Sequence, residues 1–337
     1  MDNIVVAFPK LANAQNIKKI LASLLVLVFA VVCLIGCTST AKTSVHGKVA
    51  VITKGSDSDF WSDLKNGAVS AGTEYNLDVT VEGPDNESDC KAQNKMIKNA
   101  IARNVDVIVL SAIDYEKTAP VVQDAVDSGI KVIMIDSNVD VKNTQAFIGT
   151  NNIQAGKKAG EAVENLCKDE SNVYIGIVSS GENTENNTER QQGFAEYIET
   201  LGNAKIVDTV YILSDADNAT DKTKKLLKNH PEINAIIGFN EWATLGAGTA
   251  ISELELADSV CVVGFDSNIK CVGMLETGEI DTLIVQNPFA IGYIAVSNAA
   301  QLMAGKSIDP LTETSVYVVN RKNMFNKDVQ KVLFSFE

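Results

Sequence analysis

Short apolar runs alternate along most of the chain with longer segments in which apolar residues recur at helical spacing. The runs Lys48 to Thr53 and Lys131 to Ile135 are almost continuously apolar, which is typical of strands in a parallel sheet covered on both faces. Segment 60–75 instead places Leu64 and Ala68 one helical turn apart, which predicts an amphipathic helix. The repeated alternation of strand and helix predicts an α/β fold with parallel sheets and right-handed crossovers.

The alternation predicts more strands than one doubly wound sheet usually holds. Strands are expected at 48–53, 77–81, 105–110, 131–135, 146–149, 173–178, 205–212, 233–238, 260–265, 281–285 and 315–319. The sequence therefore predicts two Rossmann-like lobes with a cleft between them.

The N-terminal segment has a different pattern from the rest of the chain. Residues Ile20 to Ile35 form an uncharged apolar run, which two lysines precede and Gly36-Cys37 follows. This resembles the lipobox of bacterial lipoproteins, and it predicts a signal peptide over 1–36 with lipidation of Cys37. Residues 37–46 are small and mostly polar, as in a tether. An uncleaved membrane anchor is the alternative, and both interpretations export the remainder of the chain.

Charge and cysteine content narrow the classes of function. The formal net charge of −14 argues against binding to nucleic acid, because phosphates require a basic surface. Beyond Cys37, the four cysteines Cys90, Cys167, Cys261 and Cys271 form no CxxC pair and have no histidine nearby for zinc. We expect free buried thiols, with a bridge between Cys261 and Cys271 left open, and neither a metal nor a cofactor.

Candidate binding groups follow the ends of apolar strands. Asp136 and Asp266 each come directly after a predicted strand, and Gln286 follows another. Ligands of open α/β sheets bind at the carboxyl ends of strands. A carboxylate there can accept hydrogen bonds from neighbouring hydroxyl groups, and each such charge-assisted bond contributes roughly 1.5 to 3 kcal/mol. With Phe265 beside Asp266, this region offers an aromatic ring, a carboxylate and an amide, which are the groups that a site for a small polyol needs.

Seven short motifs, each weak alone, occur in an order and spacing that carry a resemblance. They are Asp59-Phe60-Trp61, Ile135-Asp136-Ser137, Gly149-Thr150-Asn151-Asn152, Arg190-Gln191-Gln192-Gly193-Phe194, Asn240 with Leu245-Gly246-Ala247, Val263-Gly264-Phe265-Asp266, and Gln286-Asn287-Pro288. On these residues the chain from about 47 to 325 resembles the type I periplasmic sugar-binding proteins. The resemblance implies that Phe60, Trp61 and Phe265 hold a sugar ring. It also implies that the polar rim of the sugar is bound by Asp136, Arg190, Asn240, Asp266 and Gln286. It further implies that three crossings, near Thr150, Gln286 and Tyr317, join the lobes. The expected lobes are then residues 47–150 plus 287–316 for the N-terminal one and residues 151–286 plus 317–337 for the C-terminal one.

Each candidate residue also has a purely structural interpretation. Phe60 and Trp61 are compatible with core packing at a helix start, and the two aspartates and Asn240 are compatible with helix caps. Arg190 is compatible with a solvated position on a helix surface, and Gln286 with hydrogen bonding between crossing strands. Ser137 stands where the ribose-binding pattern has an arginine, so the identity of the sugar does not follow from the resemblance.

The resemblance implies a monomeric, lipid-anchored solute-binding protein rather than an enzyme. It would lie on the outer face of the cytoplasmic membrane or in the periplasm, and deliver a sugar or polyol to the permease of an ABC importer. A ligand sensor of the same fold that docks a membrane receptor is the alternative. A transcription regulator would need a basic helix-turn-helix segment before the first lobe. A glycosidase-like pair formed by Asp136 and Asp266 is disfavoured, because polyol binding explains both carboxylates without chemistry.

Overall fold

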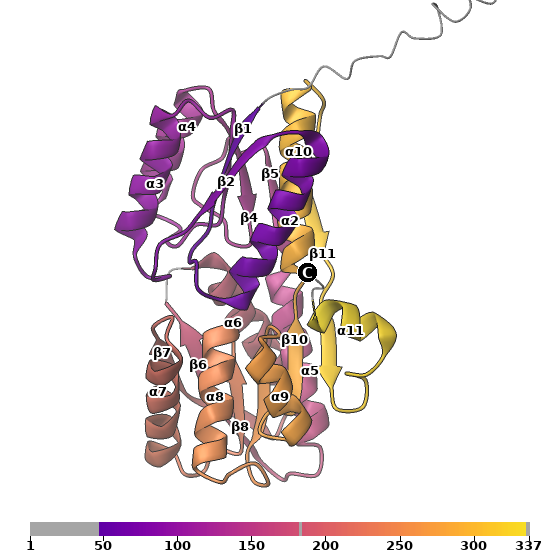
Figure 1. Cartoon of the computed structure of the whole chain (residues 1–337). Coiled ribbons are helices and arrows are strands. Elements are labelled where there is room, and N and C mark those ends of the chain that lie inside the picture. Colours follow the sequence, from indigo (N-terminus) through magenta and orange to yellow (C-terminus); the bar gives the residue numbers. More distant parts are fainter. Residues whose placement is uncertain (1–46, 182–183, 335–337) are drawn as a thin grey trace, which may run out of the picture. The chain divides into compact units, whose positions relative to one another are not determined.

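The computed structural model describes residues 47–181 and 184–334, which form two six-stranded sheets flanked by helices (Figure 1). The predictions for the signal peptide, for Cys37 and for the tether up to residue 46 lie outside these residues. Within the described part, no helix is both long and apolar enough to cross a membrane. The prediction of an α/β fold with two lobes is confirmed.

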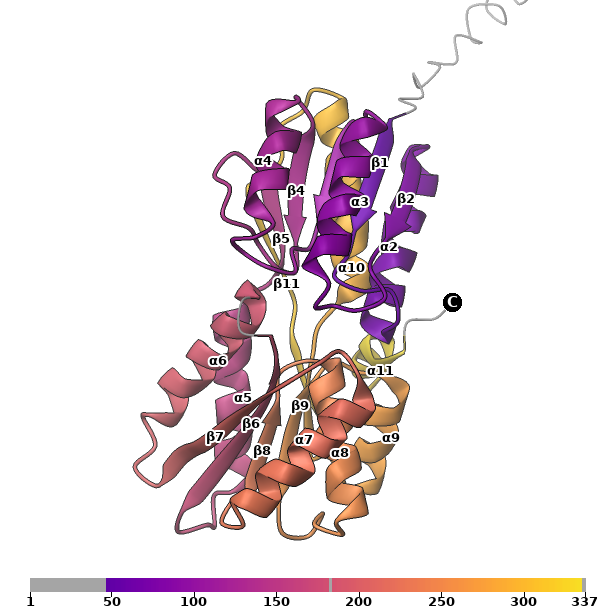
Figure 2. The same cartoon turned by 90° about the vertical axis from the view of Figure 1, so that its left-hand side faces the viewer.

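The first sheet is entirely parallel. Its strands, in spatial order, are β11 (Leu311–Thr314), β5 (Ala146–Thr150), β4 (Lys131–Ile135), β3 (Val107–Leu110), β1 (Lys48–Ile52) and β2 (Asp78–Glu82). Helices α2 (Asp59–Tyr75) and α10 (Pro288–Met303) pack side by side on one face, and α3 (Cys90–Ala102) and α4 (Ala119–Asp127) cover the other (Figure 2). Alternate residues of the central strands enter the two apolar clusters, because successive side chains point to opposite faces.

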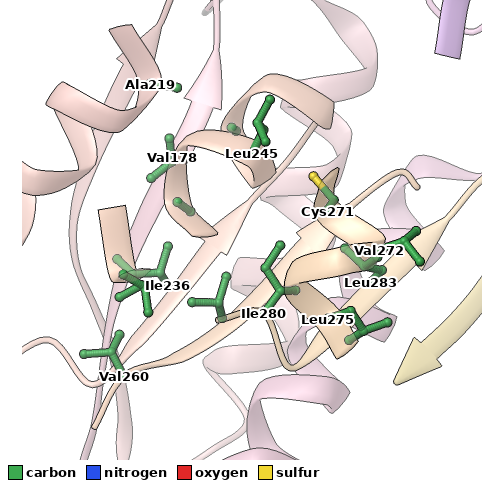
Figure 3. Close-up of a cluster of buried hydrophobic side chains, with 14 of the residues drawn as sticks. Val178, Ala219, Ile236, Leu245, Val260, Cys271, Val272, Leu275, Ile280 and Leu283 are labelled. Atoms are coloured by element: carbon green, nitrogen blue, oxygen red, sulfur yellow. The ribbon is translucent and has the colours of Figure 1, made fainter. Parts of the chain in front are cut away.

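The second sheet is parallel except for β12, which is antiparallel to β10. Its strands, in spatial order, are β12 (Tyr317–Asn320), β10 (Thr282–Val285), β9 (Cys261–Phe265), β8 (Ala235–Gly238), β6 (Val173–Ser180) and β7 (Ala204–Ile212). One face is covered by α5 (Asn152–Leu166) and α6 (Glu185–Ile198). The other is covered by α7 (Ala216–Asn229), α8 (Glu241–Glu253) and α9 (Ile269–Thr277), with α11 (Lys327–Leu333) packed against the same cluster. Figure 3 shows this cluster, in which Leu245, Cys271 and Leu275 of α8 and α9 meet Ile236 and Leu283 of the sheet.

The chain passes between the two sheets three times. It leaves the first sheet after β5, returns after β10 and crosses again between β11 and β12. Pro288 occupies the first turn of α10, where a missing backbone N–H costs nothing. Hydrogen bonds link the crossings, because Thr150 Oγ1 donates to Gln286 Oε1 at 2.8 Å and Asn151 Nδ2 donates to Glu313 Oε1 at 3.0 Å.

Polar side chains mark the starts of three helices around the strand ends. Ser58 caps α2, since its side chain accepts the Trp61 N–H. Asp215 caps α7, since its side chain accepts the Asn218 N–H. Helix α6 begins at Glu185. The first turn of α6 is polar because it faces the cleft described below.

Candidate functional site

The carboxyl ends of the parallel strands of both sheets surround a cavity that polar and aromatic side chains line. The wall includes Lys54, Ser58, Phe60, Trp61, Glu87, Asp136, Ser180, Asn186, Asn187, Arg190, Asn240, Glu241, Trp242, Asp266 and Gln286. Seven of the eight residues predicted to bind ligand are thus brought together, and the exception is Phe265.

The two strand-end aspartates share an unusual backbone conformation. Asp136 follows β4 with a φ of 55°, and Asp266 follows β9 with a φ of 71°. The amide of Asp136 donates to the Ile148 carbonyl and that of Asp266 to the Ile284 carbonyl, so each continues its sheet ladder. Asp and Asn enter this left-handed region more readily than most residues. Neither carboxylate accepts a hydrogen bond from the helix that follows, and the prediction that these aspartates are simple caps is not supported.

Asp136 is buried and already holds three partners. Its Oδ2 lies 2.9 Å from the Lys54 ammonium and accepts the Ser111 hydroxyl at 2.8 Å, while its Oδ1 accepts Asn186 Nδ2 at 3.0 Å. Burial raises the pKa of this carboxyl, but the charges of Lys54 and Arg190 outweigh that effect and hold the pKa below its usual value. Lys54 has three N–H donors, and among the described residues Asp136 is the acceptor found for them, so further donors can bind a ligand.

Arg190 is buried rather than solvated, so the interpretation as a surface arginine is wrong. Its Nε donates to Asn152 Oδ1 at 2.9 Å, and its terminal nitrogens donate to the Phe239 carbonyl and to Gln286 Oε1, both at 2.8 Å. Burial lowers the pKa of the guanidinium, against the attraction of Asp266 and Asp136. Three of its five N–H groups are engaged, which leaves two for a ligand in the cavity.

Asp266 forms the opposite wall of this network. Gln286 Nε2 donates to its Oδ1 at 2.7 Å, and among the described residues nothing donates to its Oδ2. Burial raises the pKa of Asp266 to about 6, although Arg190 and Gln286 act in the opposite direction. Because Gln286 also accepts from Arg190 and from Thr150, this one amide connects two crossings to the cavity wall.

Phe265 does not line the cavity. Its ring is fully buried, lies against Phe239 with the centroids 5.8 Å apart, and supports the Arg190 guanidinium at 4.7 Å from the ring centroid. The expectation of a third ring against the ligand is therefore corrected to a supporting role beneath Arg190. The sequence misplaces this ring because residue 265 ends the strand with its side chain on the α5 and α6 face.

Aromatic side chains reach the cavity from both lobes. Phe60 and Trp61, in the first turn of α2, meet edge to face with their centroids 4.9 Å apart. Trp242, in the first turn of α8, lines the cavity from the second lobe. Both indole N–H groups donate to Glu87 Oε1, from Trp61 at 2.9 Å and from Trp242 at 3.1 Å.

Glu241 connects the first turns of α8 and α2. Its carboxylate accepts the backbone N–H groups of Asp59 at 3.3 Å and Phe60 at 3.1 Å, together with Asn268 Nδ2 at 3.1 Å. These donors favour the ionised form, but burial is the larger effect and raises the pKa to about 7. A second contact of this kind joins the lobes where Glu185 accepts the Asn138 N–H at 2.8 Å.

Asn240 has both of the roles considered for it. Its Oδ1 accepts the Ala243 N–H at 2.9 Å and caps α8, while its Nδ2 donates to Ser180 Oγ at 3.2 Å in the cavity wall. Asn187 also donates to the Ser180 hydroxyl.

Eight wall residues, all polar or aromatic, were missed by sequence reasoning. They are Lys54, Ser58, Glu87, Ser180, Asn186, Asn187, Glu241 and Trp242. For Lys54, Glu241 and Trp242 a signal exists, since each lies within two positions after a predicted strand or a candidate residue. Among the residues that the structure describes, no three histidine, cysteine or acidic side chains are grouped so that they could hold a metal.

The sequence and structure resemble known binding proteins over most of the chain. The D-ribose/D-allose-binding protein of Pseudomonas aeruginosa is 26% identical over 293 residues, which are 83% of this chain and 90% of that protein. A solved sugar transporter from Clostridium phytofermentans is 33% identical, with a TM-score of 0.75 over 81% of this chain and 99% of that one. A carbohydrate transporter solute-binding protein from Agrobacterium radiobacter, solved with D-arabinose, has 26% identity and a TM-score of 0.84 over 86% of this chain and 99% of that one.

These relatives are named as transporters or binding proteins and not as enzymes. The family model for the periplasmic binding protein domain matches residues 49–307, which include every residue of the cavity wall. Two lobes, three crossings and a cavity at the strand ends agree with that match. The chain therefore belongs to the type I periplasmic sugar-binding protein family.

Proposed function

We propose that this chain is an extracytoplasmic, lipid-anchored solute-binding protein that captures one sugar or related polyol and delivers it to the permease of an ABC importer. The observation that carries the proposal is the composition of the cavity wall. Hydrogen-bond donors on Lys54 and Arg190 lie beside acceptors on Asp266 and Glu87, with aromatic rings next to them. A hydroxyl group donates and accepts at once, and a sugar ring has apolar C–H faces, so both parts of the wall suit such a ligand.

The contacts between the lobes support capture by closure. Glu241 binds backbone N–H groups of α2, and Asn186 of the second lobe binds Asp136 of the first. These bonds exist only when the lobes are together, so a ligand that touches both lobes adds its binding energy to the closed form. The lobes 47–150 plus 287–316 and 151–286 plus 317–337 would then move as bodies about the three crossings.

The anchor and the partner rest on other arguments. Lipidation of Cys37 is inferred from the apolar run and the lipobox-like Gly36-Cys37, and it would hold the protein at the membrane surface. Delivery to a permease is supported by relatives named as import binding proteins, among them a ribose import binding protein of Bacillus subtilis that is 23% identical over 79% of its length. The permease would distinguish the closed form from the open one.

A thermal-shift screen tests ligand capture. The purified full-length chain would be heated with D-ribose, D-allose, D-arabinose, D-fucose, D-apiose, D-glucose and D-galactose. A sugar at 100 times its dissociation constant stabilises the protein by about 2.7 kcal/mol, which raises the midpoint by several degrees. The effect should be strongly reduced in Asp266→Asn and kept in Glu82→Gln, a matched change in an ion pair with Arg103 outside the cavity. No shift with any of these or with inositols and alditols would refute the proposal.

A further inference from the structure

Glu87 is bound by both tryptophans of the chain, from opposite lobes. Trp61 Nε1 donates to Glu87 Oε1 at 2.9 Å, and Trp242 Nε1 donates to the same oxygen at 3.1 Å. The chain has two tryptophans in all, and both line the cavity together with Glu87. Among the described residues, Glu87 makes no hydrogen bond to the strand-end aspartates or to Arg190, although its negative charge helps to raise the pKa of Asp266.

The loop after β1 leaves space at Gly55 for the contact between Glu87 and the Trp61 indole. A Cβ atom on Gly55 would lie 2.8 Å from Glu87 Cγ, 3.3 Å from Trp61 Nε1 and 3.4 Å from Glu87 Oε1. A side chain there would therefore push the carboxylate away from the Trp61 indole. This second observation is independent of the hydrogen bonds, because it concerns the backbone of a different segment.

We propose that Glu87 is a positioning residue that fixes Trp61 and Trp242 as a bracket across the cleft, and thereby helps to determine ligand affinity. The proposal rests on the proposed function for the ligand itself. Without the carboxylate, two buried or half-buried indole N–H groups lose their acceptor, and each ring becomes free to rotate away from the ligand. The hydrogen bond from Trp242 to Glu87 also joins the lobes. Its loss therefore destabilises the closed form as well as loosening the cavity wall.

Among the described residues, nothing donates to the second oxygen of Glu87, Oε2. A carboxylate oxygen in a cavity wall can accept a ligand hydroxyl. Glu87 can thus hold the rings through Oε1 while Oε2 stays able to accept a hydroxyl group of the ligand. The two indole N–H groups require an oxygen acceptor at Oε1 but no negative charge, and a glutamine at residue 87 supplies such an oxygen.

The test uses three variants of the full-length chain and the sugar that gives the largest thermal shift in the panel above. Glu87→Ala should weaken binding about tenfold or more, because it removes two hydrogen bonds to a charged group. Glu87→Gln should recover about half of the binding energy that Glu87→Ala loses, since a neutral acceptor keeps roughly half the strength of a charged one. Gly55→Ala should weaken binding without removing any polar group, and Glu82→Ala serves as the control outside the cavity.

Tryptophan emission provides a readout that general destabilisation would not change in the same way. In a Trp242→Phe background the spectrum reports Trp61 alone, whose partner Glu87 lies in the same lobe, so this reading needs no sugar. There, Glu87→Ala should shift the emission maximum and Glu87→Gln should restore it. In a Trp61→Phe background the sugar-induced change reports Trp242, and it should be lost in Glu87→Ala.

The outcomes separate the two proposals. If no sugar or polyol binds the wild type, the proposed function fails, and the Trp61 spectrum still decides on the bracket. An unchanged Trp61 spectrum in Glu87→Ala overturns the bracket whether or not a sugar binds. Wild-type affinity in Glu87→Ala, with thermal stability intact, also overturns it.

Discussion

Glu241 should make ligand binding dependent on pH, because its carboxylate is buried where the lobes meet. In the closed form its pKa is about 7, compared with an ordinary value of 4.5 that we expect when the open lobes expose it to water. At pH 8 the group is ionised in both forms, and the closed form bears the full cost of burying the charge. As the pH falls through 7 the closed form takes up a proton while the open form stays ionised, so closure and binding are favoured.

The difference between the two pKa values sets the size of the effect. It corresponds to about 3 kcal/mol at 1.36 kcal/mol per pH unit. Most of this gain lies between pH 7 and pH 4.5, and between pH 8 and pH 5.5 the affinity should rise about thirtyfold. Below pH 4.5 both forms are protonated, and the contribution of Glu241 no longer changes.

The assay is titration calorimetry with the best sugar of the panel at several pH values. At each pH the dissociation constant of Glu241→Gln is divided by that of the wild type. This ratio isolates the pH dependence that Glu241 causes, because Asp266 and the other carboxylates are common to both proteins. This ratio should change about thirtyfold between pH 8 and pH 5.5, since glutamine binds no proton in this range. A ratio independent of pH, or one that changes in the opposite direction, would refute the coupling. Glu82→Gln, which is partly exposed and outside the cleft, should follow the wild type.

Three further results follow from the network around the cavity. Arg190→Met leaves three acceptors without their donor and removes the buried positive charge that attracts Asp266 and Asp136, so we expect about 3 to 5 kcal/mol less stability in urea unfolding; a loss below 1 kcal/mol would contradict the network. Asp266→Asn keeps a residue suited to the left-handed backbone but loses the charged acceptor, and calorimetry should show binding weakened about tenfold to a hundredfold with little change in unfolding. Among the described cysteines, the Sγ atoms of Cys167 and Cys261 lie 3.3 Å apart, so a thiol oxidant should join this pair in a disulfide. Peptide mapping that finds Cys261 joined to Cys271 instead would be incompatible with the structure.

Strand positions and the two-lobed architecture could be predicted from the sequence because they depend on local patterns. An apolar run such as Lys131–Ile135 has one stable place, between two layers of helices. The aspartate that ends it must then lie at the ligand edge of the sheet. Asp136 and Asp266 were therefore found from the sequence, together with Gln286 after β10.

The helix-borne part of the wall could not be predicted in the same way. Asn186 and Asn187 resemble loop residues, because a polar first turn has no apolar periodicity. Phe265 was misplaced because alternation along a strand does not tell which face of the sheet meets the ligand. Glu87 lies in a connecting segment, and its role depends on two tryptophans brought from residues 61 and 242.

The left-handed backbone at Asp136 and Asp266 restricts how this binding site can evolve. Both residues have positive φ angles, so low-cost replacements there are limited to Asn and Gly, which tolerate that conformation. A change of ligand through these two positions would therefore pass through very few intermediates. Asn186 and Trp242 lie in ordinary helical backbone, and this conformation is open to many residue types. New ligand preferences are expected to arise on the helices, while the two strand ends stay as they are.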